Sequence, residues 1–267
     1  MKLLFSEANP DYSHYLFRYA VWAIAEEGEH PSTFYDLGFF PSSTQQSKRY
    51  FMCRGLRADL NVFKLTSENR RILRKCTNIT CRIVPREEFS LTEGWINFCV
   101  DYFDTRFGSS IMTRERLLNH FDRGWVTHIL VFHDRINNKD VGIVTLYLCE
   151  PTLAHYQSAF YDVNYRNQNL GLFMMTHALS LMASKGVNFL YLGSVYESTA
   201  RYKLQFTGLQ FFNGFTWSND IKELKYLLHR DQVVSTTHLL ETDSYVNNYL
   251  DGSIELAAEQ SPFRLCK

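Results

Sequence analysis

Tyr165-Arg166-Asn167-Gln168-Asn169-Leu170-Gly171-Leu172 is the stretch that decides the fold, because it joins a strand-like run to a helix-like run. The residues from 156 to 162 are typical of a strand. The residues from 169 to 185 predict an amphipathic helix that ends at Gly186, with apolar side chains at helical spacing (Leu170, Phe173, Met174, His177 and Leu181). A buried strand is expected from 189 to 192. The order strand, helix, strand predicts that the helix crosses over between two strands of a mixed sheet.

Upstream of this stretch, the pattern indicates a β-hairpin. Val126 to Phe132 is typical of one strand, Asn137 to Asp140 of a turn, and Val141 to Leu148 of the partner strand. The C-terminal half is therefore expected to form a mixed sheet with crossover helices, in the α/β (α+β) class and similar in order to the GNAT fold. We predict three regions: a basic α/β region over 1–90, the sheet domain over 91–230, and a polar, partly acidic extension over 231–267.

Hydroxyl residues mark three expected helix starts in the first half. Ser67 is the expected N-cap of a helix from Glu68 to Lys75. Ser90 and Glu93 form a capping-box pattern before a helix that ends near Phe107, and Thr113 precedes a short helix that ends near Phe121.

The composition limits the classes of function. The chain has 267 residues and a net charge of zero, so no overall field attracts it to a polyanion. Between Lys48 and Arg86, however, the sequence contains eleven Lys or Arg residues and only two acidic residues, which indicates a local basic belt. No run approaches 18 apolar residues, so no membrane span is expected. The six cysteines are scattered without a Cys-x-x-Cys pair, which predicts a reduced cytoplasmic protein without a metal site.

The junction between strand and helix carries the expected chemistry. A helix start offers backbone N–H groups and a positive dipole end, which suit a phosphate or a carbonyl oxygen. In acyl-CoA-using GNAT enzymes this loop reads Arg or Gln, two residues, Gly, one residue, then Gly or Ala. Arg166 and Gly171 fit that pattern, but Asn169 takes the place of the first glycine, where a side chain would hinder a pyrophosphate. The alternative is an ordinary strand–loop–helix turn.

Short motifs in a fixed order add a family resemblance. The motifs are Phe34-Tyr35-Asp36-Leu37-Gly38-Phe39, the segment from Leu65 to Arg74, Phe160-Tyr161-Asp162, Leu170-Gly171, Tyr191-Leu192-Gly193, and Tyr202-Lys203 with Phe206. Together they resemble the aminoacyl-tRNA–protein transferases of the arginyl and bacterial leucyl types, which contain a GNAT-like domain. The resemblance runs from about Phe34 to Trp217.

The resemblance implies transfer of an aminoacyl group from aminoacyl-tRNA to an amine, which forms an amide. Three departures leave the acceptor open among a protein N-terminus, a peptide and a small-molecule amine. The family's Cys-x-x-Cys is reduced to Cys53, its Arg-Arg-Ser-Gly is replaced by Phe40-Pro41-Ser42-Ser43, and Val163 stands in place of a proline. Because the ester of aminoacyl-tRNA is already activated, we expect neither a metal nor a cofactor.

Three residues are candidates for the reaction itself. Asp162 is expected to orient or deprotonate the amine, with a turn or cap carboxylate as the alternative. Tyr161 and Tyr191 are expected on neighbouring strands, where they would line an aminoacyl pocket; aromatic core packing is the alternative for both.

A second set of residues is expected to bind the carrier. Lys203 is expected at the terminal phosphates with Tyr202 and Gln205, and Arg166, Asn169 and Gly171 at the helix start. Arg70, Arg71 and Arg74 are expected at the acceptor-stem backbone, unless they form only a solvated basic face. Two other functions remain open: an acyl-CoA-dependent GNAT N-acyltransferase and a GNAT-like binding module without catalysis.

Overall fold

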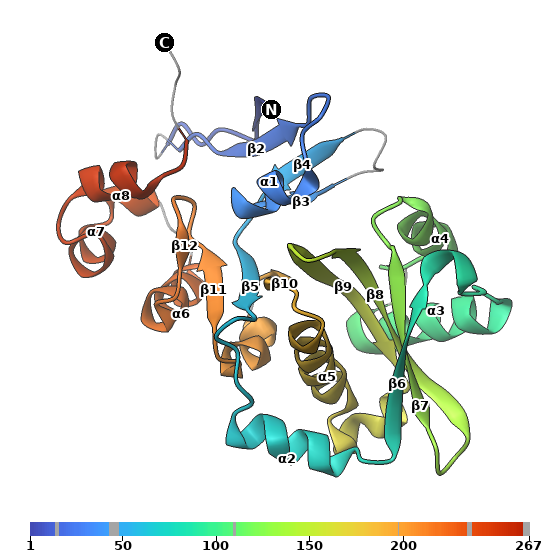
Figure 1. The fold of residues 1–267 in the computed structure, drawn as a ribbon. Helices are drawn as coiled ribbons and strands as arrows, with labels where there is room; N and C mark the ends of the chain where they lie inside the picture. Colours follow the sequence, from blue (N-terminus) through green and yellow to red (C-terminus); the bar gives the residue numbers. More distant parts are fainter. Residues whose placement is uncertain (14–15, 43–47, 109–110, 197, 234–236, 264–267) are drawn as a thin grey trace. The chain divides into compact units, whose positions relative to one another are not determined.

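The computed structural model describes residues 1–267 except 14–15, 43–47, 109–110, 197, 234–236 and 264–267 (Figure 1). The chain forms two compact units. Unit 1 comprises 1–56, 194–204 and 209–267, and unit 2 comprises 57–193 and 205–208. The predicted boundaries at residues 90 and 230 remain predictions. Within the described part of the chain, no helix is both long enough and apolar enough to cross a membrane.

Unit 2 is built on a mixed sheet, which confirms the predicted α/β class. Its strands follow the spatial order β5, β10, β9, β8, β7, β6. Strands β6 to β9 pair antiparallel, and β10 runs parallel to β9. Their bounds are β5 Gly55–Asp59, β6 Ile79–Pro85, β7 His128–Asp134, β8 Lys139–Cys149, β9 Leu153–Tyr161 and β10 Phe189–Ser194.

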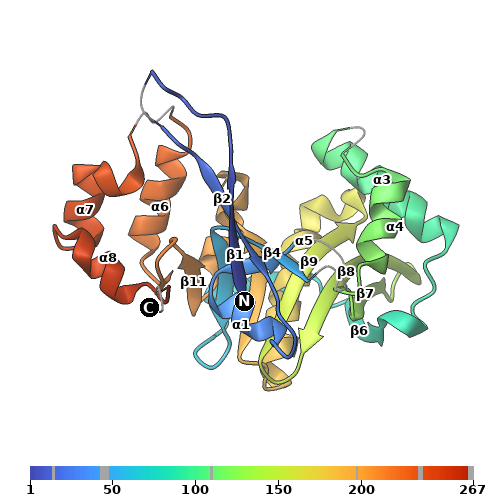
Figure 2. The same ribbon diagram turned by 90° about the horizontal axis from the view of Figure 1, so that it is seen from above.

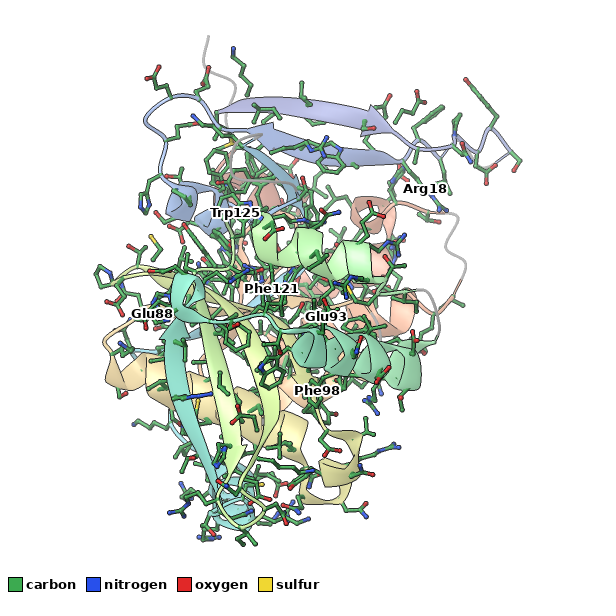
Figure 3. All side chains as sticks on the ribbon, turned by 90° about the vertical axis from the view of Figure 1, so that its right-hand side faces the viewer. Arg18, Glu88, Glu93, Phe98, Phe121 and Trp125 are labelled. Atoms are coloured by element: carbon green, nitrogen blue, oxygen red, sulfur yellow. The ribbon has the colours of Figure 1, made fainter. Side chains whose placement is uncertain are left out.

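Helices cover both faces of this sheet (Figure 1). Val131 of β7 belongs to a core cluster with α3 (Glu93–Phe107) and α4 (Arg114–Asp122), whose residues Phe98 and Phe121 are labelled in Figure 3. The next residue, Phe132, contacts Phe173 of α5 (Leu170–Ser184) with ring centroids 6.0 Å apart. Successive strand residues point to opposite faces, so α3 and α4 lie on one face and α5 on the other. Helix α2 (Ser67–Lys75) packs against α5.

The helix starts differ from the predicted caps in detail. Thr66, not Ser67, is the N-cap of α2, and it forms a capping box with Asn69. Thr92, not Ser90, caps α3 by accepting from the backbone N–H of Trp95 at 3.4 Å. In both places a neighbouring threonine offers the same hydroxyl at the position where the backbone turns. The cap at Thr113 is confirmed.

The crossover is confirmed as predicted. Helix α5 begins one residue after Asn169, and Gly186 follows its end with a φ of 74°. Before α5, a short 3-10 helix, η2 (Val163–Gln168), leads from the end of β9. A second one, η1 (Arg86–Glu88), follows β6, and η3 (Ser198–Gln205) follows β10.

Unit 1 has a separate antiparallel sheet in the order β1 (Lys2–Glu7), β2 (Tyr19–Ile24), β4 (Arg49–Met52), β3 (Phe39–Pro41). Its other elements are α1 Pro31–Asp36, β11 Leu209–Phe212, β12 Trp217–Ser218, α6 Ile221–Arg230, η4 Leu239–Glu241, α7 Asp243–Tyr249 and α8 Ile254–Gln260.

A buried carboxylate joins the C-terminal helices of unit 1. Glu223 of α6 is 4% exposed. It accepts hydrogen bonds from the Tyr245 hydroxyl of α7 at 2.6 Å, from Ser218 Oγ at 2.6 Å and from Asn213 Nδ2 at 2.9 Å. A buried carboxylate is tolerated only with such donors. The predicted polar extension is therefore partly helical and joined to α6 through this network.

Candidate functional site

The start of α5 follows the short helix η2 at the end of strand β9. Asn169, its N-cap, is exposed and adopts the left-handed conformation, with φ 58° and ψ 40°, and its side chain makes no capping hydrogen bond. Glycine adopts this conformation readily and asparagine is among the residues that tolerate it. Asn169 therefore adopts a conformation that a glycine would also tolerate, although it adds a side chain at this position.

Gly171, the second residue of α5, makes room for an aromatic ring. A Cβ built on Gly171 would lie 2.8 Å from Cε1 of Tyr161 and 3.1 Å from its hydroxyl oxygen. Only a residue without a side chain lets the Tyr161 ring lie this close to the first turn of the helix. The Tyr161 hydroxyl therefore lies beside the positive end of α5.

Tyr102 of α3 completes a pair of phenols with Tyr161. Their ring centroids are 4.8 Å apart, with planes inclined at 56°. Burial and the neighbouring Tyr161 raise the pKa of Tyr102, and Arg106 opposes them. Tyr102 thus keeps its proton at neutral pH. Tyr102 lies 59 positions before Tyr161 in the chain, and no local motif links the two residues.

Asp162 is held as a turn carboxylate. Its Oδ1 accepts from the backbone N–H of Asn164 at 3.0 Å and from its side-chain amide at 2.9 Å, and its Oδ2 pairs with Lys139 Nζ at 2.9 Å. Burial pushes the pKa of Asp162 up, but Lys139 and Asn164 outweigh it and hold the pKa below its usual value. Such a carboxylate is a weak base at neutral pH. It matches the capping alternative stated for this residue.

Tyr191 lies away from Tyr161. It is fully buried, and its hydroxyl accepts from Nη1 of Arg57 at 3.2 Å. In the parallel pairing of β9 with β10, Tyr191 lies opposite His155, six residues before Tyr161 on β9. The two tyrosines are indeed on neighbouring strands, but the register separates them, and Tyr191 packs in the core.

The basic helix α2 reaches the junction. Lys75, its last residue, donates from Nζ to the backbone carbonyl of Asn167 at 2.5 Å. Arg166 is exposed on the same short helix, η2. Two cations therefore flank the loop that leads to the start of α5.

The three predicted arginines of α2 differ in their surroundings, although all are exposed. Arg71 forms an ion pair with Glu68, with Nε at 2.7 Å and Nη2 at 2.6 Å from the two carboxylate oxygens. Arg70 donates from Nη1 to the carbonyl of Leu65 at 2.6 Å. Arg74 lies in the last turn. The charges of the helix are thus available on a solvent face, with that of Arg71 partly neutralised.

The remaining predicted contacts lie on η3. Tyr202 and Lys203 belong to unit 1, whereas Gln205 belongs to unit 2. Tyr202 is 46% exposed. Burial lowers the pKa of Lys203 to about 8, so its ammonium group is charged at neutral pH but loses its proton more easily than an exposed lysine. Across the described residues, no group of three His, Cys, Asp or Glu is arranged to hold a metal ion.

Several solved structures are similar to this chain, all at low sequence identity. L-PGS from Bacillus licheniformis is 10% identical over 62% of this chain and 51% of its own, with a TM-score of 0.41. FemX is 10% identical over 53% of this chain and 52% of its own, with a TM-score of 0.40. The aminoglycoside acetyltransferase meta-AAC0020, from an uncultured soil metagenomic sample, is 18% identical over 48% of this chain and 84% of its own, with a TM-score of 0.32.

This chain spans about half of the length of the first two proteins. At these scores the likenesses carry no argument about activity. No family model matches the chain, and no curated protein matches it. The resemblance to the aminoacyl-tRNA–protein transferases therefore remains a prediction.

Proposed function

We propose that unit 2 is an acyltransferase that moves an aminoacyl group from aminoacyl-tRNA to an amine. The observation that supports this proposal is the meeting of three features at one junction. The start of α5, with its exposed N-cap residue Asn169, offers backbone donors, the Tyr161 and Tyr102 phenols lie beside it, and the basic helix α2 ends at the loop before it. The helix start and the phenols can stabilise a carbonyl oxygen that becomes negative during the reaction, and the basic helix α2 can bind the phosphates of a nucleic acid.

The reaction needs few groups from the protein. The neutral amine attacks the ester carbonyl carbon, a C–N bond forms, and the C–O bond to the ribose breaks. The proton of the amine passes to the departing ribose oxygen, so the step is balanced without a further reactant. Holding the two reactants together supplies about 7–11 kcal/mol. One donor to the oxyanion supplies about 3–4 kcal/mol.

In this proposal the Tyr161 hydroxyl and the N–H groups of the first turn of α5 donate to the oxyanion. Gly171 supports this role, because it lets the phenol approach the helix start. Tyr102 positions the Tyr161 ring. Asp162 holds the turn through Asn164 and Lys139, and its lowered pKa favours positioning over proton removal.

The exposed arginines of α2 are proposed to bind the acceptor-stem backbone. Phosphate contacts of this kind add affinity without reading sequence. Arg74 is the strongest candidate, because Glu68 already neutralises Arg71. Arg166 and Lys75 would continue the basic path to the start of α5.

Lys203, with Tyr202 and Gln205, is proposed as a further contact to the terminal phosphates of the tRNA. Burial lowers the pKa of Lys203 to about 8, and a bound phosphate would raise it again and keep the ammonium group charged. Replacing Lys203 by Met should weaken binding of charged tRNA. If affinity is unchanged, Lys203 has no part in carrier binding.

A second donor, acyl-CoA, is the alternative, because Asn169 has a left-handed backbone that glycine, the residue of the GNAT pattern at this position, adopts readily. Calorimetry with acetyl-CoA and with charged tRNA separates the two donors. Binding of acetyl-CoA alone would assign the acyl-CoA reaction. The Asn169→Gly variant sharpens the test, since it removes the side chain that hinders a pyrophosphate.

The transfer itself is tested with a pool of charged tRNAs, each carrying a labelled amino acid, and a library of peptide and small-molecule amines. We expect label to move from one tRNA to one class of acceptor, which identifies both substrates. Tyr161→Phe serves as the matched enzyme control. No transfer with any donor, together with binding of charged tRNA, would instead support a binding module without catalysis.

A further inference from the structure

The outermost strand of the unit 1 sheet is exposed along its whole length. Strand β1 pairs with β2 through six consecutive residue pairs, from Lys2 opposite Ile24 to Glu7 opposite Tyr19, without a bulge (Figure 2). In the described part of the chain, no strand pairs with the other side of β1. A regular edge of this kind presents backbone N–H and C=O groups in the spacing that a further strand needs.

The middle of β1 has three consecutive apolar side chains, which is typical of a strand that another element covers. Leu3, Leu4 and Phe5 are 37%, 52% and 64% exposed. Edge strands of monomeric proteins are usually protected by a central charge, a proline, a bulge or a covering element. The middle of β1 has no such residue, because its charges, Lys2 and Glu7, stand at its two ends.

We propose that β1 pairs antiparallel with β1 of a second copy of this chain, which joins two four-stranded sheets into one. A two-fold axis perpendicular to the sheet requires that one residue faces its own copy. Centring the axis on Leu4 brings Leu4 beside Leu4 and Leu3 beside Phe5 of the other copy. Every apolar side chain of the strand then has an apolar partner on its own face.

The charges of β1 favour this direction of pairing. In the antiparallel arrangement centred on Leu4, Lys2 of one copy lies opposite Ser6 of the other and Glu7 opposite Met1, so like charges do not face each other. A parallel arrangement would place Lys2 beside Lys2 and Glu7 beside Glu7. Like charges opposite each other are destabilising in a sheet, so the antiparallel direction is favoured over the parallel one. The pairing of Leu4 with Leu4 and of Leu3 with Phe5 favours a second copy over an unrelated peptide.

Analytical ultracentrifugation of the full chain over a range of concentrations tests the proposal. A six-residue edge buries less surface than a standard interface, so we expect a reversible dimer whose population rises with protein concentration. Leu4→Lys and Leu4→Glu should each weaken it by about tenfold or more, because the two-fold axis places like charges together. An equimolar mixture of these two variants should associate again, as opposite charges then meet at position 4.

Ile136→Lys is the matched control. Ile136 is 77% exposed and belongs to unit 2, so this variant adds the same charge away from β1 and should dimerise as the unmodified chain does. Circular dichroism and thermal melting of the Leu4 variants check that the exposed substitution leaves the fold intact. A monomer at every concentration, full dimerisation of both Leu4 variants, or failure of their mixture to associate would each overturn the proposal.

Discussion

The ring of Tyr161 lies against Gly171, so closely that a Cβ built on the glycine would be 2.8 Å from the ring carbon Cε1. This contact fixes the end of strand β9 against the first turn of α5. It also sets the position of the Tyr161 hydroxyl relative to the helix N-terminus.

Gly171→Ala should displace the Tyr161 ring and lower the rate of transfer strongly. The added methyl group also overpacks the junction, which should cost about 1–3 kcal/mol of unfolding free energy. Gly94→Ala is the control, because Gly94 is also the second residue of its helix, and a Cβ there comes no closer than 3.7 Å to its nearest neighbour, Thr92 Oγ1. Denaturant melts and transfer assays of both variants check the prediction. Equal behaviour of the two variants would contradict it.

Tyr161→Phe should keep the ring contact and lose the hydroxyl. We expect kcat to fall by about 10²- to 10³-fold with little change in stability, because a donor to the oxyanion is removed. Tyr102→Phe should lower kcat less, since Tyr102 acts on Tyr161. Steady-state kinetics with charged tRNA measure both effects. An unchanged kcat for Tyr161→Phe would exclude the hydroxyl from the reaction.

Asp162 should stabilise the fold in a pH-dependent way. Its pKa is lower in the folded chain than the usual value of about 3.9, so its stabilisation is fully present above that value and is lost as the pH falls through the lower, folded pKa. Asp162→Asn should therefore reduce the melting temperature at neutral pH and flatten its decline in acid. The pH profile of kcat should show no inflection near neutrality from this residue. An inflection near pH 7 that disappears in Asp162→Asn would assign it as the base instead.

Neutralising Arg70, Arg71 and Arg74 to Gln should weaken tRNA binding and lower its dependence on salt. Each lost phosphate contact reduces the slope of log K against log salt by roughly 0.7–0.9. Glu68→Gln is the opposite control, because it releases Arg71 from its ion pair and should raise the affinity. Filter binding across salt concentrations gives the slopes. Identical slopes for the triple variant and the unmodified chain would show that α2 does not contact the tRNA.

The sequence predicts those parts of the fold whose causes are local. The apolar spacing from Leu170 to Leu181 and the glycine at 186 predict α5 closely, because both act within one helix. The N-caps Thr66 and Thr92 lie one or two residues from the predicted serines. Several hydroxyl residues are close together in each place, and the backbone conformation determines which of them caps the helix.

The candidate site depends on contacts that no local pattern contains. Tyr191 lies on the strand next to that of Tyr161, as expected, but the register of the two parallel strands places it opposite His155. Tyr102 reaches Tyr161 only because α3 packs across the end of β9. The contact of Lys75 with Asn167 likewise follows from the packing of α2 on α5, and the sequence between them gives no sign of it.

The hydrogen bond from Tyr245 to Glu223 limits how this chain can be shortened. A truncation before α7 would remove one donor from a carboxylate that lies inside unit 1, and water would have to enter or the side chain would have to move out. Shortened forms meant for crystallography or binding assays should therefore retain residues through Tyr249, or replace Glu223 by a neutral side chain.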